Sequence, residues 1–371
     1  MEKTKRQSNF ELLRIFAMLM IILFHVQLYG PQQIITAGSG YFTQPVIYLR
    51  LLIFEVLTPL GMIGNGLFIM ISGYFMNANE HINTGKIGKK LLLQLGFATV
   101  ILMIAYAVCV TFFKDQLGAL RTVTVDFFNS SWWFIGYYFC IIIIAKAFLN
   151  GFTAKLTQSQ FTVLLLTVFA VSQFAWTRNL LDSLASGLRD LIIGVFYFLL
   201  GGYIARYNPF KNLKTSAVFL TIAAAYAVRF LSAYNMLSQS IYEFVKSNSD
   251  GPYIPLFQGY SNYEFTMVIL TICCFELFRR LNVPHNTVIN NLAKATLMIY
   301  LIHETSFSQS FYGYDNWMET LTANIGLYCL KLVKWTVITF VIGLAAYGLY
   351  TLLGKLLPRM RSWFVVQKAG E

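Results

Sequence analysis

Long apolar stretches alternate with short polar ones along almost the whole chain, and most charged residues fall in the short ones. A helix needs about 20 largely apolar residues to cross the hydrocarbon core of a bilayer. Runs that approach or exceed this length lie at about residues 10–29, 52–76, 88–113, 132–150, 160–177, 190–207, 215–233, 263–281, 289–307 and 325–354. The pattern predicts an all-α, polytopic membrane bundle of about ten transmembrane helices.

The composition agrees with this prediction. The chain is 57% hydrophobic and 12% charged, whereas soluble domains have about 25% charged residues. No linker rich in proline, glycine or serine divides the chain, so we expect a single membrane-embedded domain over residues 1–371. The net charge of +12 does not require a nucleic-acid partner, because lysine and arginine collect in the cytoplasmic loops of membrane proteins.

The distribution of charge predicts the orientation of the bundle. Basic residues concentrate near both chain ends and in every second loop, while most carboxylates fall in the other loops. By the positive-inside rule, both termini are expected in the cytoplasm. The first run could instead be a signal peptide, whose apolar part is short and uncharged. It contains Glu11, Arg14 and His25, so we expect a permanent span.

Arg14 and His25 are the polar residues of the first run that need an explanation. They are eleven residues apart, which turns a helix about 20° past three full turns and raises it about 16 Å, so both lie on one face. An arginine at the centre of a membrane helix costs roughly 2.5–3.5 kcal/mol on insertion scales, so such residues usually face a protein interior or a watery cavity. The alternative is that Arg14 reaches headgroups and His25 makes one interhelical hydrogen bond.

Several segments resemble one family in the same order. The arginine, ten intervening residues and histidine of the first run resemble the signature of acyltransferase family 3, integral membrane O-acyltransferases of glycans. Further similar segments are GMIGNGLFIMISGYFM (61–76), SSWWFIGYYF (130–139), FYFLLGGYIARY (196–207) and ATLMIYLIH (295–303). The chain departs from the family at GKIGKK (85–90), where relatives commonly have arginines. No fused extracellular esterase-like domain is expected, so neither is a second acyl transfer within the chain.

The resemblance implies transfer of an acyl group, expected to be acetyl, from cytoplasmic acyl-CoA to a hydroxyl of a cell-surface or lipid-linked polysaccharide. Histidine is suited to take a proton near neutral pH, and we expect His25 to be the general base. Glu55 could fix the tautomer of His25, or be an ordinary solvated carboxylate. His303 could bind the acceptor, act as a second acid–base group, relay an acyl group or simply meet headgroups.

The same resemblance implies a binding site for acetyl-CoA at the inner ends of the helices. Cations suit its phosphates, and those predicted there are Arg14, Lys86, Lys89 and Lys90. Positive-inside bias alone could also explain the three lysines. Asn65 and Ser72 are seven residues apart on one face and could polarise the thioester carbonyl, while the neighbouring glycines favour close helix packing. A nucleophilic role for Ser72 is less favoured.

No metal is expected, because the four histidines have no metal-binding spacing and the five cysteines fall within apolar runs. The expected partners are acyl-CoA, a glycan or lipid-linked glycan and membrane lipids, and the sequence leaves a homodimer open. The expected location is a bacterial plasma membrane. The alternative function is a proton-coupled transporter or polysaccharide exporter without covalent chemistry, since such carriers also hold buried charges. Carriers often have paired halves, which this sequence does not show.

Overall fold

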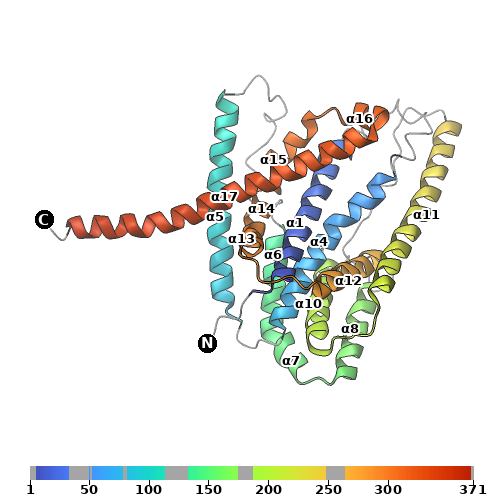
Figure 1. The fold of residues 1–371 in the computed structure, drawn as a ribbon, viewed down its shortest axis with the longest axis horizontal. Coiled ribbons are helices and arrows are strands. Elements are labelled where there is room, and N and C mark those ends of the chain that lie inside the picture. Colours follow the sequence, from blue (N-terminus) through green and yellow to red (C-terminus); the bar gives the residue numbers. More distant parts are fainter. Residues whose placement is uncertain are drawn as a thin grey trace.

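The computed structural model describes residues 6–32, 50, 52–77, 82–112, 133–173, 187–247 and 264–368, and this part of the chain is all-helical. Helices α1 and α4 lie in the middle of the bundle, with α5 and α11 at opposite flanks (Figure 1). The longest helix, α17, crosses α1 obliquely in this view. The fold is therefore the predicted helical bundle.

The long helices correspond to the predicted runs. They are α1 (Ser8–Gln27), α4 (Ile53–Met76), α5 (Thr84–Phe112), α6 (Trp133–Ile144), α8 (Gln158–Gln173), α10 (Leu188–Tyr207), α11 (Thr215–Ser247), α12 (Phe265–Arg280) and α17 (Ile325–Lys368). A π-helical turn, η1 (Leu28–Gln32), follows α1, and another, η5 (Ala145–Leu149), joins α6 to α7 (Asn150–Ala154). The segment after α12 is broken into α13 (Thr287–Leu292), the 3₁₀ turn η7 (Ala293–Ala295) and α14 (Thr296–His303). Short helical pieces then connect to α17: α15 (Ser306–Ser310), η8 (Phe311–Tyr314) and α16 (Trp317–Ala323).

Among the described residues, seven helical segments are long and apolar enough to cross a membrane. They are Ser8–Pro31, Val56–Met76, Thr84–Phe112, Trp133–Ala154, Leu188–Tyr207, Thr215–Ser232 and Ile325–Leu356. The other three of the ten predicted spans are helical as well but shorter. Helices α8 and α12 have 16 residues each, about 24 Å at 1.5 Å per residue.

The ninth predicted span, 289–307, is not one continuous helix. After one short helix the backbone tightens into η7, where the Thr296 hydroxyl donates to the Ala293 carbonyl. Helix α14 then ends at His303, because Thr305 is extended and its side chain accepts from the Ser308 backbone N–H as the N-cap of α15. Apolar periodicity predicted the span but could not locate these breaks.

Close backbone contacts fix α4 between α1 and α10. A Cβ added at Gly73 would lie 1.9 Å from the Phe198 carbonyl oxygen of α10, and one added at Gly64 would lie 2.8 Å from the Ala17 carbonyl oxygen of α1. Small residues permit such approach in a membrane, where van der Waals packing drives helix association. The packing expected of the two glycines beside Asn65 and Ser72 is confirmed at Gly73 and also at Gly66, where an added Cβ would lie 2.9 Å from Thr271 Cγ2 of α12.

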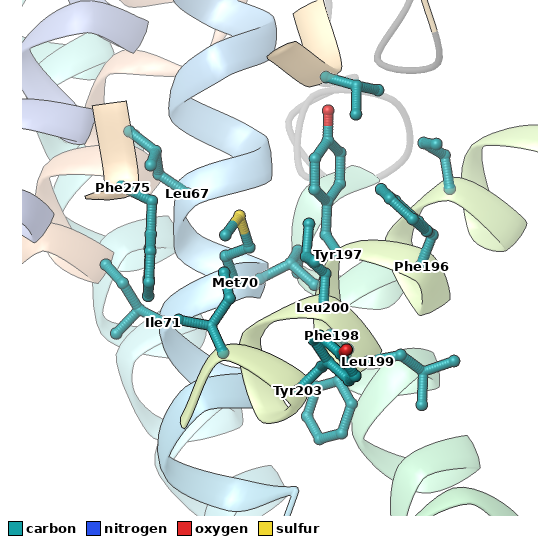
Figure 2. Close-up of a cluster of buried hydrophobic side chains, with 14 of the residues drawn as sticks. Leu67, Met70, Ile71, Phe196, Tyr197, Phe198, Leu199, Leu200, Tyr203 and Phe275 are labelled. Atoms are coloured by element: carbon teal, nitrogen blue, oxygen red, sulfur yellow. The ribbon is translucent and has the colours of Figure 1, made fainter. Parts of the chain in front are cut away.

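The core has two parts that meet along α1. Phe10, Leu13 and Ala17, in the first half of α1, belong to a cluster with α4, α10 and α12, part of which Figure 2 shows around Met70 and Phe198. Met18, Ile22 and Val26 of α1 belong instead to a cluster with α14 and α17. This arrangement brings both ends of α1 against elements that are far away in the sequence.

Candidate active site

Two histidines and a carboxylate meet where α1 and α14 end. His25 Nδ1 lies 3.0 Å from His303 Nε2 and 2.7 Å from Glu304 Oε2, and His303 Nε2 lies 3.7 Å from the same oxygen. All three residues are buried, with 8%, 0% and 5% of their surfaces exposed. The sequence separates the two histidines by 278 positions, so only packing of α14 against α1 creates this cluster, named here the histidine cluster (His25, His303 and Glu304).

The hydrogen bonds determine which nitrogen of each ring carries a proton. His303 Nδ1 lies 2.8 Å from the Ile299 carbonyl oxygen, which only accepts, so Nδ1 carries the proton and His303 Nε2 holds a lone pair. His25 Nδ1 faces that lone pair and must therefore donate. This assignment leaves Nε2 of His25 as its unprotonated nitrogen, the form that a general base requires.

Glu304 completes the cluster as a charge neighbour of His25. Its Oε2 is 2.7 Å from Nδ1, yet no donor in the described residues aligns with this oxygen in hydrogen-bond geometry, because the Nδ1 proton points at His303. We regard the contact as an ion pair that strengthens when His25 takes up a proton. A buried carboxylate beside an imidazolium stabilises the charged ring.

The same three side chains are also a candidate metal centre. Their ligand atoms lie within 4.8 Å of one another, and two imidazoles with one carboxylate is a common donor set for divalent metals. The hydrogen bond from His303 to Ile299 would orient a metal ligand equally well. The absence of a metal, expected from the sequence, therefore stays a prediction.

A cavity of about 260 Å³ lies along the same faces of α1 and α14. Its described lining residues are Arg6, Arg14, Met18, Ile21, Phe68, Ser72, Ile87, Lys90, Leu91, Phe134, Ile135, Tyr138, Ala293, Lys294, Thr296, Leu297 and Tyr300. Four of them are cationic and none of them is acidic. We call it the donor cavity, because Arg14 and Lys90, two of the residues predicted from the sequence to bind an acyl donor, are among these cations.

One carboxylate organises part of this positive charge. Glu11 Oε1 lies 3.0 Å from Nη1 of Arg14 and 3.3 Å from Nη1 of Arg6. Glu11 itself is buried, with 5% of its surface exposed. Glu11 offsets only one of the four positive charges of the donor cavity, and the remaining excess suits an anion with several phosphates.

Polar groups also lie on the α4 side of the donor cavity. The Ser72 hydroxyl oxygen is 2.9 Å from the Phe68 carbonyl oxygen and 3.3 Å from the Tyr138 hydroxyl oxygen. The single Ser72 hydroxyl proton can be donated to either of these two oxygens. Two hydroxyl groups thus lie within an otherwise aromatic and aliphatic wall.

The structure brings together some of the predicted binding residues and not others. Arg14, Lys90 and Ser72 line the donor cavity. Lys86 and Lys89 are exposed on α5 and are not among the lining residues, because Lys89 points about 100° away from Lys90 and Lys86 lies one turn earlier.

Two further predicted residues lie on α4. Asn65 is buried there, with 8% of its surface exposed, and does not line the donor cavity. Glu55 also lies on α4, but its side chain is outside the described part of the chain. In the described part, the carboxylate beside His25 is that of Glu304.

Sequence reasoning overlooked Glu304 and left Lys294 unexplained. Both flank the apolar run that forms α14, one just before it and one just after it. A charged residue next to a predicted membrane histidine was a usable signal for Glu304. No pattern in the sequence, however, indicated that η7 would turn Lys294 toward α1.

Comparison with known proteins gives one match. The family model described as an acyltransferase domain, acyltransferase family 3, matches residues 7–354. No curated protein and no solved structure matches the chain.

Proposed function

The chain belongs to acyltransferase family 3 and is a multi-pass, membrane-bound acyltransferase, and from this premise we propose that it transfers an acetyl group from cytoplasmic acetyl-CoA to a hydroxyl of a cell-surface or lipid-linked polysaccharide. One observation carries the proposal: the cationic donor cavity and the histidine cluster lie in succession along the same faces of α1 and α14. Membership in a family of enzymes sets the transporter alternative aside.

The donor binds with its phosphates among Arg6, Arg14, Lys90 and Lys294. Arginine forks bind phosphate oxygens in pairs, while lysines contribute mobile point charges. Because CoA is cytoplasmic, this assignment agrees with the positive-inside prediction that both termini lie in the cytoplasm of a bacterial cell.

The lysines outside the donor cavity and the α4 residues have smaller roles. Lys86 and Lys89 raise the concentration of the anionic donor near the opening through their charge. Ser72, beside Tyr138, contacts the pantetheine arm or the thioester oxygen. For Asn65 the same role remains a prediction from the sequence.

The acceptor hydroxyl is activated at His25. Nε2 takes the hydroxyl proton as the oxygen attacks the thioester carbonyl carbon, which forms a C–O bond and a tetrahedral oxyanion. The C–S bond then breaks, and the CoA thiolate receives the proton from the His25 imidazolium. Atoms and charge balance, and His25 returns to its starting tautomer.

His303 and Glu304 act on His25 without meeting the substrate. His303 accepts the Nδ1 proton of His25 in a hydrogen bond and fixes the tautomer. Glu304 stabilises the imidazolium that forms during the reaction. Among the roles left open for His303, its burial and contacts favour this one over acceptor binding. The role of Glu55 remains a prediction from the sequence.

The test uses purified protein in lipid nanodiscs with radiolabelled acetyl-CoA and a crude surface glycan. Wild type should bind acetyl-CoA and release CoA thiol only when the glycan is present. His25→Ala should bind CoA with turnover lower by about 10²-fold or more, and Arg14→Ala should bind it more weakly. The control is His285→Ala, an exposed histidine outside the site. Wild type that neither binds nor consumes acetyl-CoA or longer acyl-CoAs would overturn the proposal.

A further inference from the structure

The donor cavity stops one helical turn before the histidine cluster. On α1 it is lined by Arg14, Met18 and Ile21, and the next residue on that face is His25. On α14 the last lining residue is Tyr300, and the following turn carries His303 and Glu304. The remaining gap is therefore about one turn, or 5.4 Å, at the end where a thioester must arrive.

Tyr300 fills this gap. Only 4% of its surface is exposed, and its ring centroid lies 5.9 Å from that of His303, edge to face. On its other side it contacts Phe134 of α6, with ring centroids 5.7 Å apart. The phenol ring thus stands between the donor cavity and the histidine cluster.

Phe134 holds the tyrosine in this position. The Phe134 backbone N–H donates to the Tyr300 hydroxyl at 3.4 Å, and the Phe134 ring contacts Phe68 and Tyr138, at 6.3 and 6.4 Å between centroids. The closed end of the donor cavity is therefore an aromatic wall anchored on α4, α6 and α14. Rotation of the Tyr300 ring alone disturbs fewer of these contacts than movement of a whole helix would.

We propose that Tyr300, held by Phe134, determines acyl-chain specificity: it closes the donor cavity before His25 and limits the transferred group to a short chain. This inference rests on the proposed function. The thioester meets the acceptor when the Tyr300 ring turns aside, and the space freed by one ring accommodates an acetyl group. A longer acyl chain would have to displace the Phe134 ring as well, which disrupts packing of a buried cluster.

Removal of the Tyr300 or Phe134 ring should change which acyl-CoA the protein prefers. We compare acetyl-, butyryl- and octanoyl-CoA by kcat/KM in nanodiscs for wild type, Tyr300→Phe, Tyr300→Ala and Phe134→Ala. Wild type and Tyr300→Phe should prefer acetyl-CoA. The ratio of octanoyl to acetyl transfer should rise at least about tenfold in Tyr300→Ala and Phe134→Ala, the discrimination that a single methylene produces in a fitted pocket.

Tyr203→Ala is the matched control, because Tyr203 is also a buried tyrosine, at 8% exposure, but belongs to α10 and does not line the donor cavity. The ratio of octanoyl to acetyl transfer in Tyr203→Ala should equal that of wild type. If an alanine variant does not turn over, competition of octanoyl-CoA against labelled acetyl-CoA gives the same comparison by binding. Unchanged ratios in both alanine variants would overturn the inference while leaving the proposed function intact. Absence of transfer from every acyl-CoA by wild type would instead overturn the proposed function.

Discussion

At the scale of single residues, the site depends on proton positions in a buried network. Ile299 fixes His303 by a 2.8 Å hydrogen bond, and His303 in turn fixes His25 at 3.0 Å. The sequence indicated both histidines but not that they touch. In the proposed mechanism, a proton on Nε2 of His25 would leave no base for the acceptor hydroxyl. Substitutions at His303 and Glu304 should therefore lower turnover more than they weaken binding of the acyl donor.

Glu304→Gln should lower kcat by about 10²-fold, because the amide cannot stabilise the imidazolium. The KM for acetyl-CoA should stay close to that of wild type, since Glu304 does not line the donor cavity. Glu304→Asp should recover part of the rate. A loss of donor binding equal to the loss of turnover would indicate a structural role instead.

Chelation distinguishes a proton network from a metal centre at the same three residues. Dialysis of the purified protein against EDTA should leave glycan acetylation unchanged, and elemental analysis should find less than one transition-metal ion per chain. Loss of activity on dialysis, with recovery on adding zinc or manganese, would refute the predicted absence of a metal.

At the scale of elements, a 3₁₀ turn and the ends of helices position the side chains of the candidate site. The break at η7 orients Lys294 toward the donor cavity, and the end of α14 carries His303 and Glu304. At its own C-terminus, α12 holds the α10–α11 connection through Arg280, which donates to the carbonyl oxygens of Leu213 and Phe210. Glu276, with 1% of its surface exposed, orients the Arg280 side chain.

Glu276→Leu should destabilise the bundle strongly. Glu276 lies 2.7 Å from both Arg279 and Arg280, and removing one partner of a buried ion pair costs about 3–5 kcal/mol. We expect a fall of several degrees in the midpoint of thermal unfolding in detergent. Glu319→Leu, at an exposed acid outside the site, is the control. A midpoint unchanged in Glu276→Leu would contradict the proposed anchoring.

At the scale of the whole molecule, the orientation of the bundle in the membrane decides which end of the candidate site faces the cytoplasm and which end faces the cell exterior. If the termini are cytoplasmic, the opening of the donor cavity at Arg6 and Lys90 faces the CoA pool. The histidine cluster then lies in the outer half of the bundle, nearer the surface glycans. The sequence leaves a homodimer open, and light scattering of the detergent-solubilised protein is the direct measurement of its oligomeric state.

Cysteine labelling in intact cells tests this orientation. In a variant without the five natural cysteines, a membrane-impermeant maleimide should label Glu319→Cys, in α16, before the cells are opened. His285→Cys, between α12 and α13, should be labelled only afterwards, because the charge pattern assigns its loop to the cytoplasm. The reverse pattern would invert the topology and remove the cytoplasmic donor assignment.

The sequence by itself determined the helical class and nearly all the helix positions in the described part of the chain, and it indicated Arg14 and His25 as candidate site residues. Apolar length and the helical repeat are local properties, so they can be recognised along the chain. Local rules failed at 289–307, where a 3₁₀ turn at Ala293–Ala295 interrupts the α-helix and Thr305 caps the helix that follows.

Only the tertiary structure decided which distant groups meet. It placed His303 and Glu304 against His25, turned Lys294 into the donor cavity and left Lys86 and Lys89 outside it. Such contacts depend on the rotation and depth of one packed helix against another, and glycines such as Gly64 set that packing by allowing backbones to touch. A helix that is apolar on all sides shows nearly the same hydrophobic pattern whichever way it is rotated. The sequence could therefore not specify which side chains of neighbouring helices meet.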